Sequence, residues 1–335
     1  MPKLCRFFII ACMIAPAARA HPLDWGKTIE TADSLILLQD YDRAAEYLDS
    51  LVHKNGIDID ARFMKLNIAF AEMADYESYG LDGKRFMPAV DSIMFIIKRA
   101  LASADCRDSL KLLFFRGTLL GEQAIVNAKT GNVFQSLLDG ESAYRIMTTI
   151  RSADPTFKQT AYSIGLYDYY SGVSFKWLPG FRRRLERGLN ELRTAASDES
   201  WVRYAAKNSL GWILLDEKKY EEADSMVSSV LESYPDNTQF LQIKSRVAFA
   251  SGNFREAIAR SQRLIDLASK RTKKNWVDIL SGYQLIAASF LAMGNRETAV
   301  LSAQTGLELK VPREARRIEW VNRHLKYLSS IAAGR

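Results

Sequence analysis

A pattern that occurs twice in register in the second half of the chain constrains the fold more than any other feature. The interval from Tyr220 to Phe254 equals the interval from Ala223 to Ala257. Apolar residues around these positions recur at helical spacing. A repeat of this length is one pair of helices, which cannot bury its apolar face until a neighbouring pair stacks on it. The sequence therefore predicts an all-α array of stacked helix pairs.

The residue types at fixed places in the repeat resemble a known superfamily. Gly211 is followed within one repeat by Tyr220, Ala223 and Pro235. A small residue in the first helix, Ala in the second and a terminal Pro resemble the tetratricopeptide repeat (TPR). The resemblance implies an all-α, TPR-like α-solenoid, a right-handed superhelix of helix hairpins.

Further copies extend this pattern along the chain. Residues 25–58 contain one, in which Tyr41 and Ala44 match Tyr220 and Ala223. Another, at 294–299, follows at a longer interval, and we expect the eight extra residues near 270 to lengthen the next helix at its start. We also expect a loop from 78 to 85. The sequence predicts about seven helix hairpins and a C-terminal capping helix that begins at Pro312.

The segment from 161 to 196 resembles a group of exported bacterial TPR proteins. It combines a Gly-x-Tyr-x-Tyr-Tyr helix beginning at Gly165, a Leu178–Pro179 break and a Gly-Leu-x-x-Leu helix beginning at Gly188. It has a fainter likeness to certain eukaryotic mitochondrial and cytosolic TPR proteins. The resemblance implies fold and export, and it transfers no site residue.

The first twenty residues have the features of a signal peptide. A basic start, the apolar run 7–14 and the small residues Ala18 and Ala20 precede His21. We therefore expect residues 1–20 to be removed and 21–335 to form a single superhelix in a bacterial periplasm. Lipid attachment at Cys12, in a lipobox-like Ile9–Cys12 sequence, is the alternative.

The composition of the mature chain argues against several classes of protein. Without residues 1–20 it carries 43 basic and 39 acidic side chains, a net charge of +4, which gives no nucleic-acid signal. Its single cysteine, Cys106, cannot form an internal disulfide. No second apolar run is long enough to span a bilayer, although peripheral association with a membrane stays open.

Motifs that would indicate a metal, a cofactor or catalysis are missing. The three histidines are not spaced for a zinc site with Cys or with each other. No glycine-rich nucleotide motif and no nucleophile motif is present, so we expect no cofactor and no enzyme activity. Carboxylate pairs for hydrolysis on a helical scaffold are the less favoured alternative.

The resemblance places candidate binding residues on the first helix of each repeat, which lines the concave groove of TPR arrays. In the last three repeats these positions hold Asn208, Trp212, Gln242, Arg246 and Gln284. An aromatic ring, an arginine and amides suit an extended peptide, the amides pairing with its backbone. Packing of Trp212 between neighbouring helices is the competing interpretation.

The aromatic residues Tyr167, Tyr169, Tyr170 and Trp177 lie beside the basic run 182–187. A glycan or cell-wall ligand would use such a patch. We favour a structural interpretation, with aromatics packed between repeats and arginines on a solvated helix face. The basic stretch 270–274 is likewise expected to be a solvated helix start.

Taken together, these features predict a non-catalytic scaffold in the cell envelope. Its partner would be a protein or a peptide held in the concave groove. The alternatives are a glycan- or cell-wall-binding protein that uses the helix near 162–177, and an enzyme on a helical scaffold.

Overall fold

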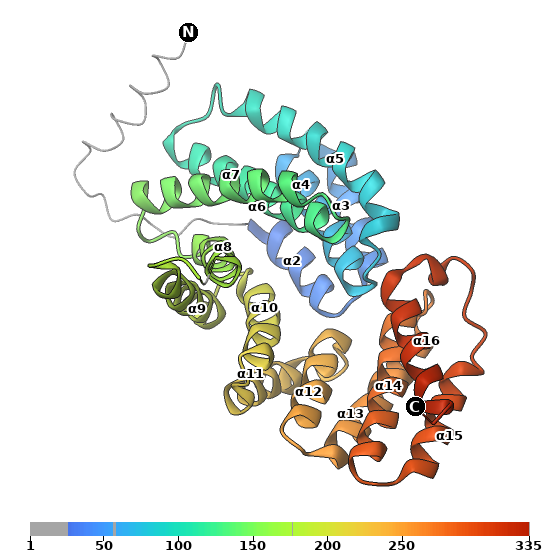
Figure 1. Cartoon of the computed structure of the whole chain (residues 1–335). Helices are drawn as coiled ribbons and strands as arrows, with labels where there is room; N and C mark the ends of the chain where they lie inside the picture. Colours follow the sequence, from blue (N-terminus) through green and yellow to red (C-terminus); the bar gives the residue numbers. More distant parts are fainter. Residues whose placement is uncertain (1–25, 56–57, 176, 335) are drawn as a thin grey trace. The chain divides into compact units, whose positions relative to one another are not determined.

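The computed structural model describes residues 26–55, 58–175 and 177–334, and Figure 1 shows their helices in chain order. The predicted signal peptide and Cys12 lie outside these residues. In the described part of the chain every regular element is a helix and no strand occurs. The all-α prediction is confirmed.

The helices of the described residues form the seven predicted hairpins and a final helix. The pairs are α2 (Gly26–Leu37) and α3 (Tyr41–Asn55), α4 (Ile59–Asp75) and α5 (Tyr79–Ala100), α6 (Cys106–Lys129) and α7 (Val133–Ala153), α8 (Thr160–Ser174) and α9 (Phe181–Ser197), α10 (Arg203–Asp216) and α11 (Tyr220–Ser233), α12 (Thr238–Ala250) and α13 (Phe254–Lys270), and α14 (Trp276–Ala292) and α15 (Arg296–Leu307). The last helix is α16 (Glu319–Ala332).

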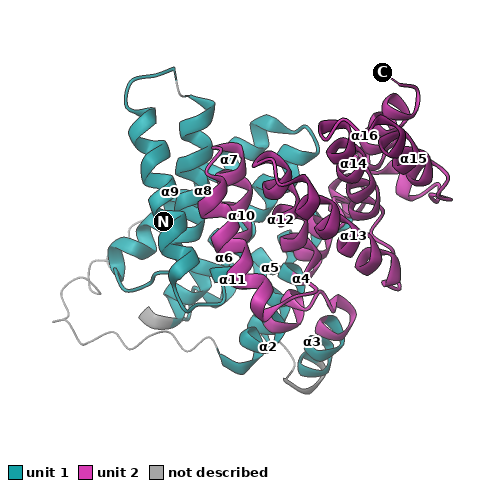
Figure 2. Cartoon of the chain, turned by 90° about the horizontal axis from the view of Figure 1, so that it is seen from below, with its two compact units in different colours: residues 1–33, 45–67, 85–206 teal, residues 34–44, 68–84, 207–335 magenta. Residues whose placement is uncertain are grey.

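Two compact units share this chain, and Figure 2 colours them separately. Unit 1 comprises residues 1–33, 45–67 and 85–206, of which the described part begins at residue 26. Unit 2 comprises residues 34–44, 68–84 and 207–335. Unit 2 thus combines α11–α16 and most of α10 with two short segments from the start of the chain, each of which contains the turn of a hairpin.

A close helix contact in unit 1 joins α8 and α9, which lie side by side in Figure 2. A Cβ atom on Gly188 would lie 2.4 Å from the backbone nitrogen of Tyr169. One on Gly172 would lie 2.7 Å from the backbone nitrogen of Leu185. The two backbones therefore approach within a distance that a side chain would not permit, and glycine is required on both helices.

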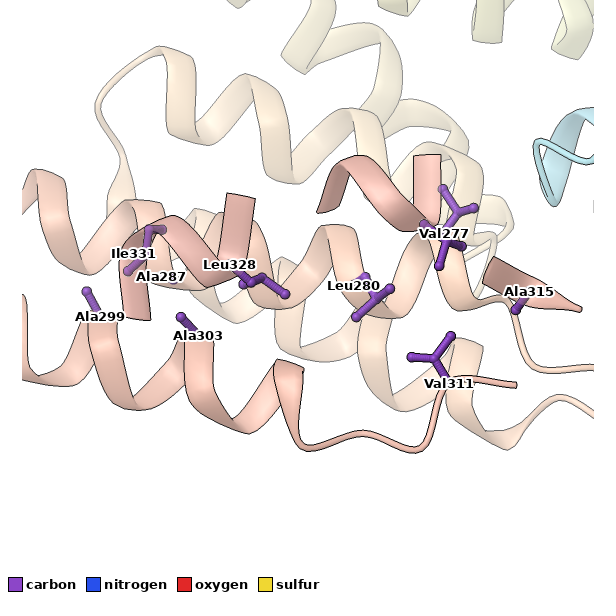
Figure 3. Close-up of a cluster of buried hydrophobic side chains, with 10 residues drawn as sticks. Val277, Leu280, Ala287, Ala299, Ala303, Val311, Ala315, Leu328 and Ile331 are labelled. Carbon is purple, nitrogen blue, oxygen red and sulfur yellow. The ribbon is translucent and has the colours of Figure 1, made fainter. Parts of the chain in front are cut away.

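The core at the C-terminal end of unit 2 is built by α14, α15 and α16 (Figure 3). Val277, Leu280 and Ala287 of α14 pack with Ala299 and Ala303 of α15 and with Leu328 and Ile331 of α16. Small residues on α15 let the neighbouring helices come close. The last helix thus covers the apolar side of the final hairpin, as a capping helix must.

The predicted start of that capping helix was wrong. The residues after Pro312 form a 3₁₀ turn, Ala315–Arg317, instead of the first turns of an α-helix. Ile318 then adopts an extended conformation, with φ −80° and ψ 125°, and α16 begins at Glu319. The extended residue breaks the helical path, so the turn and α16 are separate elements.

The loop predicted for residues 78–85 was also wrong. These residues are the first turns of α5, which begins at Tyr79. Glu77 has a φ of 49°, which makes the preceding turn tight, and Ser78 contacts the carboxylate of Asp82 through its hydroxyl. The pair of glycines in this stretch indicated a loop, but the local cap and the packing of Tyr79 and Phe86 in the core favour a helix.

The eight extra residues near 270 were predicted to lengthen one helix, and they are instead divided among three places. Helix α13 has 17 residues where α11 has 14, and α14 has 17 where α12 has 13. The connection between α13 and α14 accounts for one more residue. Arg271 and Asn275 lie in this connection, which contacts Asp75 at the end of α4.

Replacing Gly188 with Ala should destabilise the protein by about 3 kcal/mol or more, because the new methyl group overlaps the backbone of α8. Gly121→Ala in α6 is the matched control, since nothing lies within 4 Å of a Cβ there. That control should be neutral or more stable by up to about 1 kcal/mol. Chemical denaturation measures both, and equal stabilities would contradict the close approach of α8 and α9.

Candidate protein-binding surface of unit 2

The five predicted groove residues lie on the first helices of the last three hairpins, all within unit 2. Asn208 and Trp212 belong to α10, Gln242 and Arg246 to α12, and Gln284 to α14. Each side chain is half-buried. Half-buried polar and aromatic side chains on successive helices are suited to contact both their neighbours and a ligand.

Arg246 joins three of these helices. Its guanidinium lies over the ring of Trp212, 5.8 Å from the ring centroid, and its Nη2 donates to the hydroxyl of Ser281 at 2.8 Å. Its Nε has no hydrogen-bond partner among the described residues. Burial lowers the pKa of Arg246, and the nearby Asp278 opposes that shift. The ring of Trp212 therefore makes a cation–π contact with Arg246, and the Nε–H of Arg246 makes no hydrogen bond within the described residues.

Gln284 is engaged by the capping helix. Its Oε1 contacts Nδ1 of His324, and the His324 ring lies 5.9 Å from the ring of Trp320. Burial, together with the charge of Arg246, lowers the pKa of His324 to about 4. His324 is therefore neutral at physiological pH, and Nδ1 can carry the proton that Gln284 accepts.

The side chains of the two remaining candidates, Asn208 and Gln242, differ in the hydrogen bonds that they make within the protein. Nδ2 of Asn208 donates to Oε1 of Gln239 at 3.4 Å, which is long for a hydrogen bond. The Gln242 side chain has no hydrogen-bond partner in the described part of the chain. Gln242 is therefore the candidate residue whose donor and acceptor are both available.

A second polar feature of unit 2 was not predicted. Two asparagines, Asn237 and Asn275, each join the start of one helix to the end of a distant one. Oδ1 of Asn237 accepts from the backbone N–H of Phe240, and its Nδ2 donates to the carbonyl of Leu37 at 2.8 Å. Leu37 is the last residue of α2. One amide thus caps the N-terminus of α12 and the C-terminus of α2.

Asn275 makes the same pair of contacts one hairpin further on. Its Oδ1 accepts from the N–H groups of Val277 and Asp278, both at 3.1 Å. Its Nδ2 donates at 2.8 Å to the carbonyl of Asp75, the last residue of α4. The same shift along the chain relates the two asparagines and the two carbonyls that they contact. We call these contacts and the buried groups around them the turn network, which comprises Gln39, Tyr41, Asp75, Asn237, Thr238, Arg271 and Asn275.

The Asp75 carboxylate is the acidic centre of the turn network. It accepts from Nη1 of Arg271 at 2.6 Å, the hydroxyl of Tyr41 at 3.0 Å and Nε2 of Gln39 at 3.1 Å. Burial raises the pKa of Asp75, and Arg271 opposes that shift. Burial acts to lower the pKa of Arg271, but Asp75 outweighs it and the pKa is raised. Such a pair is stable only because several donors share the buried charge.

Asp278 is a second buried acid beside the turn network, and its carboxyl group has fewer hydrogen-bond partners than that of Asp75. Its side chain is 3% exposed, and Oδ2 has no hydrogen-bond partner among the described residues. Burial, and then the charge of Asp75, raise the pKa of Asp278 to about 8, while Thr238, Arg271 and Arg246 lower it. Asp278 is therefore protonated in the folded state at neutral pH.

The basic stretch 270–274 was predicted to be a solvated helix start. Its lysines Lys270, Lys273 and Lys274 are exposed as predicted, but Arg271 is not, and the stretch is the end of α13 and the connection to α14. Arg271 is held by Asp75, and Lys273 pairs with Glu72 at 2.6 Å. The hydroxyl of Tyr76 donates to the carbonyl of Lys273 at 2.7 Å. An asparagine directly before α12 and directly before α14 was the only signal in the sequence. It did not reveal the carbonyl that each asparagine contacts, which lies far earlier in the chain.

The aromatic segment of unit 1 divides into packed and exposed residues. Tyr169 is buried, and the ring of Tyr167 lies 4.6 Å from that of Tyr144, as the structural interpretation predicts. Asp168 is buried beneath Nε of Arg184, at 2.8 Å, and Nε of Arg187, at 2.7 Å. Arg184 is therefore a half-buried internal partner, in contrast to the expected solvated face, whereas Arg182, Arg183 and Arg187 are exposed as expected.

The described residues hold no group of three or more His, Cys, Asp or Glu side chains that could bind a metal ion. Within the same residues, none of the helices has both the length and the apolar character needed to cross a bilayer.

Comparison of the whole structure with solved structures decides the fold. The chain superposes on a chain of the APC/C hetero-tetramer Cut9–Hcn1 with a TM-score of 0.55 and 12% identity, over 94% of this chain and 55% of that one. The chain has the tetratricopeptide-repeat fold. The TPR prediction is confirmed, and the first helices of its hairpins are α10, α12 and α14 in unit 2.

Other TPR structures match with lower scores. A TPR protein from Parabacteroides merdae has a TM-score of 0.41 and 14% identity, over 91% of this chain and 98% of that one. The type IV pilus biogenesis factor PilW has a TM-score of 0.44 and 14% identity, over 76% and 97%. No protein-family model and no curated protein sequence matches the chain.

Asp278→Asn should change how stability depends on pH. The folded-state pKa of about 8 lies above the ordinary value of 3.8, so the acid contributes stability that is complete below about pH 4 and lost as the pH rises through about 8. The free energy of unfolding of the variant should therefore fall less steeply from pH 5 to 8, by up to about 1.4 kcal/mol per pH unit. Urea denaturation at several pH values measures this. Asp216→Asn, at an exposed position, is the control, and parallel profiles for all three proteins would refute the assignment.

Asn275→Asp tests the contact between Asn275 and the carbonyl of Asp75, which joins the segments 207–335 and 68–84 of unit 2. Aspartate keeps the acceptor that caps α14, but it replaces the donor to the Asp75 carbonyl with a second acceptor. We expect the variant to lose at least about 2 kcal/mol of stability, because two acceptors then face each other in a buried site. Asn295→Asp is the matched control, since exposed Asn295 only accepts from the N–H of Thr298. Equal effects in thermal denaturation would show that Asn275 is merely a local cap.

Proposed function

We propose that the protein is a non-catalytic scaffold that binds an extended segment of a partner protein along α10, α12 and α14. The location proposed for this activity is the bacterial cell envelope, after export through the N-terminal segment. The TPR fold supports a binding role because stacked helix pairs present a continuous surface on which an extended chain can lie.

One observation carries the proposal. On adjacent first helices the guanidinium of Arg246 lies over the ring of Trp212, and the half-buried Gln242 lies one helical turn before Arg246 on α12. An amide can pair with the backbone of an extended peptide through both its donor and its acceptor. An aromatic ring beside an arginine is the kind of anchor on which protein interfaces depend.

The other two candidate residues receive narrower roles. Gln284 is held by His324, so we propose that it positions α16 against α14 instead of contacting the ligand. Asn208 makes one long hydrogen bond to Gln239, and a stronger bond to a peptide carbonyl would replace it. The binding surface therefore centres on Trp212, Gln242 and Arg246.

Photo-crosslinking from Gln242 tests this surface directly. The full-length protein with benzoylphenylalanine at Gln242 should crosslink a discrete partner in cells, and mass spectrometry of the product should identify an extended peptide segment. Gln242 is the preferred site because its replacement breaks no hydrogen bond in the described residues. Adding Trp212→Ala to this variant should reduce the crosslinked product by about tenfold or more.

The matched control places the same photoreactive residue at Gln262, an exposed glutamine on the second helix of the same hairpin. Circular dichroism should show that Trp212→Ala leaves the helix content unchanged. Equal crosslinking from positions 242 and 262, or a product unaffected by Trp212→Ala, would refute the proposed binding surface.

A further inference from the structure

The end of the α8–α9 hairpin in unit 1 exposes apolar and aromatic side chains to solvent. Trp177 is 75% exposed, and its ring has no aromatic partner among the described residues. Tyr170, Val173 and Phe175 of the same end are also among the exposed large hydrophobic residues. The rings of Phe175 and Phe181 lie 5.3 Å apart across the turn, so the two helices meet in an apolar tip.

Positive charge lies next to this tip. Residues 177–187 contain four basic side chains and one acidic side chain. Arg184 and Arg187 are balanced by Asp168, but Arg182 and Arg183 are exposed at the first turn of α9. The only ion pair of Arg182 in the described residues is to exposed Glu186, at 3.7 Å. The tip therefore combines exposed aromatic residues with two cations that are available to a negatively charged partner.

The helices behind the tip are held firmly, which allows the tip to present these residues in one place. The backbones of α8 and α9 are in contact at Gly172 and Gly188, and Asp168 joins α8 to two arginines of α9. Gly180, with a φ of 90°, allows the chain to turn into α9. The contacts that hold α8 against α9 use Gly172, Gly188 and Asp168. The exposed side chains of the tip take no part in them, so they are available to a partner.

The chemistry of these residues favours one kind of partner. Tryptophan and tyrosine are enriched where the acyl chains of a bilayer meet the headgroups, and arginine is attracted to anionic lipids at the same depth. A bilayer offers no shaped groove to a partner. A hairpin end that projects apolar residues beside cations does not need one, because its side chains can enter the headgroup region directly. We propose that the α8–α9 tip binds reversibly to the surface of an anionic lipid bilayer, with Trp177 and Phe175 at the headgroup level and Arg182 and Arg183 on the lipid phosphates.

Cosedimentation of the protein with vesicles tests the proposal. Binding should be weak with phosphatidylcholine alone, rise as phosphatidylglycerol is added up to about equal amounts, and fall at high salt as the charges are screened. Trp177→Ala should weaken binding by about tenfold, because the exposed ring no longer leaves water. Neutralising Arg182 and Arg183 should weaken binding by about fivefold for each charge removed.

Matched controls distinguish binding through the α8–α9 tip from non-specific adsorption to vesicles through any exposed aromatic or basic side chain. Phe134→Ala removes an aromatic ring of similar exposure, 73%, on α7, and the pair Arg255→Gln and Lys310→Gln removes two exposed cations elsewhere. These variants should bind vesicles like the wild type, and all variants should melt at similar temperatures. Equal binding to neutral and anionic vesicles, or equal losses in control and tip variants, would overturn the proposal. Absence of vesicle binding, with cell-wall fragments quenching the fluorescence of Trp177, would assign the tip to a glycan instead.

Discussion

Unit 2 depends on two asparagine amides that each satisfy the ends of two helices. A helix end leaves backbone groups without partners, and burying such an end without a cap is costly. Asn237 and Asn275 meet this requirement on both sides, with one oxygen toward their own helices and one nitrogen toward α2 and α4. Helix ends that would otherwise need water are buried against each other, and this allows residues 34–44 and 68–84 to belong to the same compact unit as the last repeats.

The buried charges follow from that arrangement. Once the carbonyl of Asp75 is buried against Asn275, its carboxylate is buried too, and Arg271 must accompany it. Asp278, in the first turn of the helix that Asn275 caps, is then kept protonated by its burial and, secondly, by the charge of Asp75, which together raise its pKa. Arg246 is coupled to the same group, because burial lowers the pKa of Arg246 and only the ionised form of Asp278 opposes that shift. The electrostatics of the proposed binding surface are thus linked to the turn network through one buried carboxyl group.

The sequence was sufficient for features that depend on local pattern and insufficient for those that depend on distant partners. The in-phase Tyr220/Ala223 and Phe254/Ala257 pairs predicted the helix hairpins, and the position of Arg246 beside Trp212 followed from the same phase. Arg271 was misjudged because an arginine in a polar stretch looks the same whether or not an aspartate 196 residues away is buried against it. Gly80 and Gly83 led to the prediction of a loop where α5 begins, because tertiary packing overrides the weak preference of glycine against helix.

The separation between the asparagines and their distant partners has a consequence during synthesis. The carbonyls of Leu37 and Asp75 are synthesised 200 residues before Asn237 and Asn275, respectively. At translation rates of roughly 5–20 residues per second, that interval lasts about 10–40 seconds. Throughout it, the first two hairpins have helix ends that only water can satisfy, and unit 2 cannot close. In a chain truncated before residue 237, the carbonyls of Leu37 and Asp75 never receive their asparagine donors.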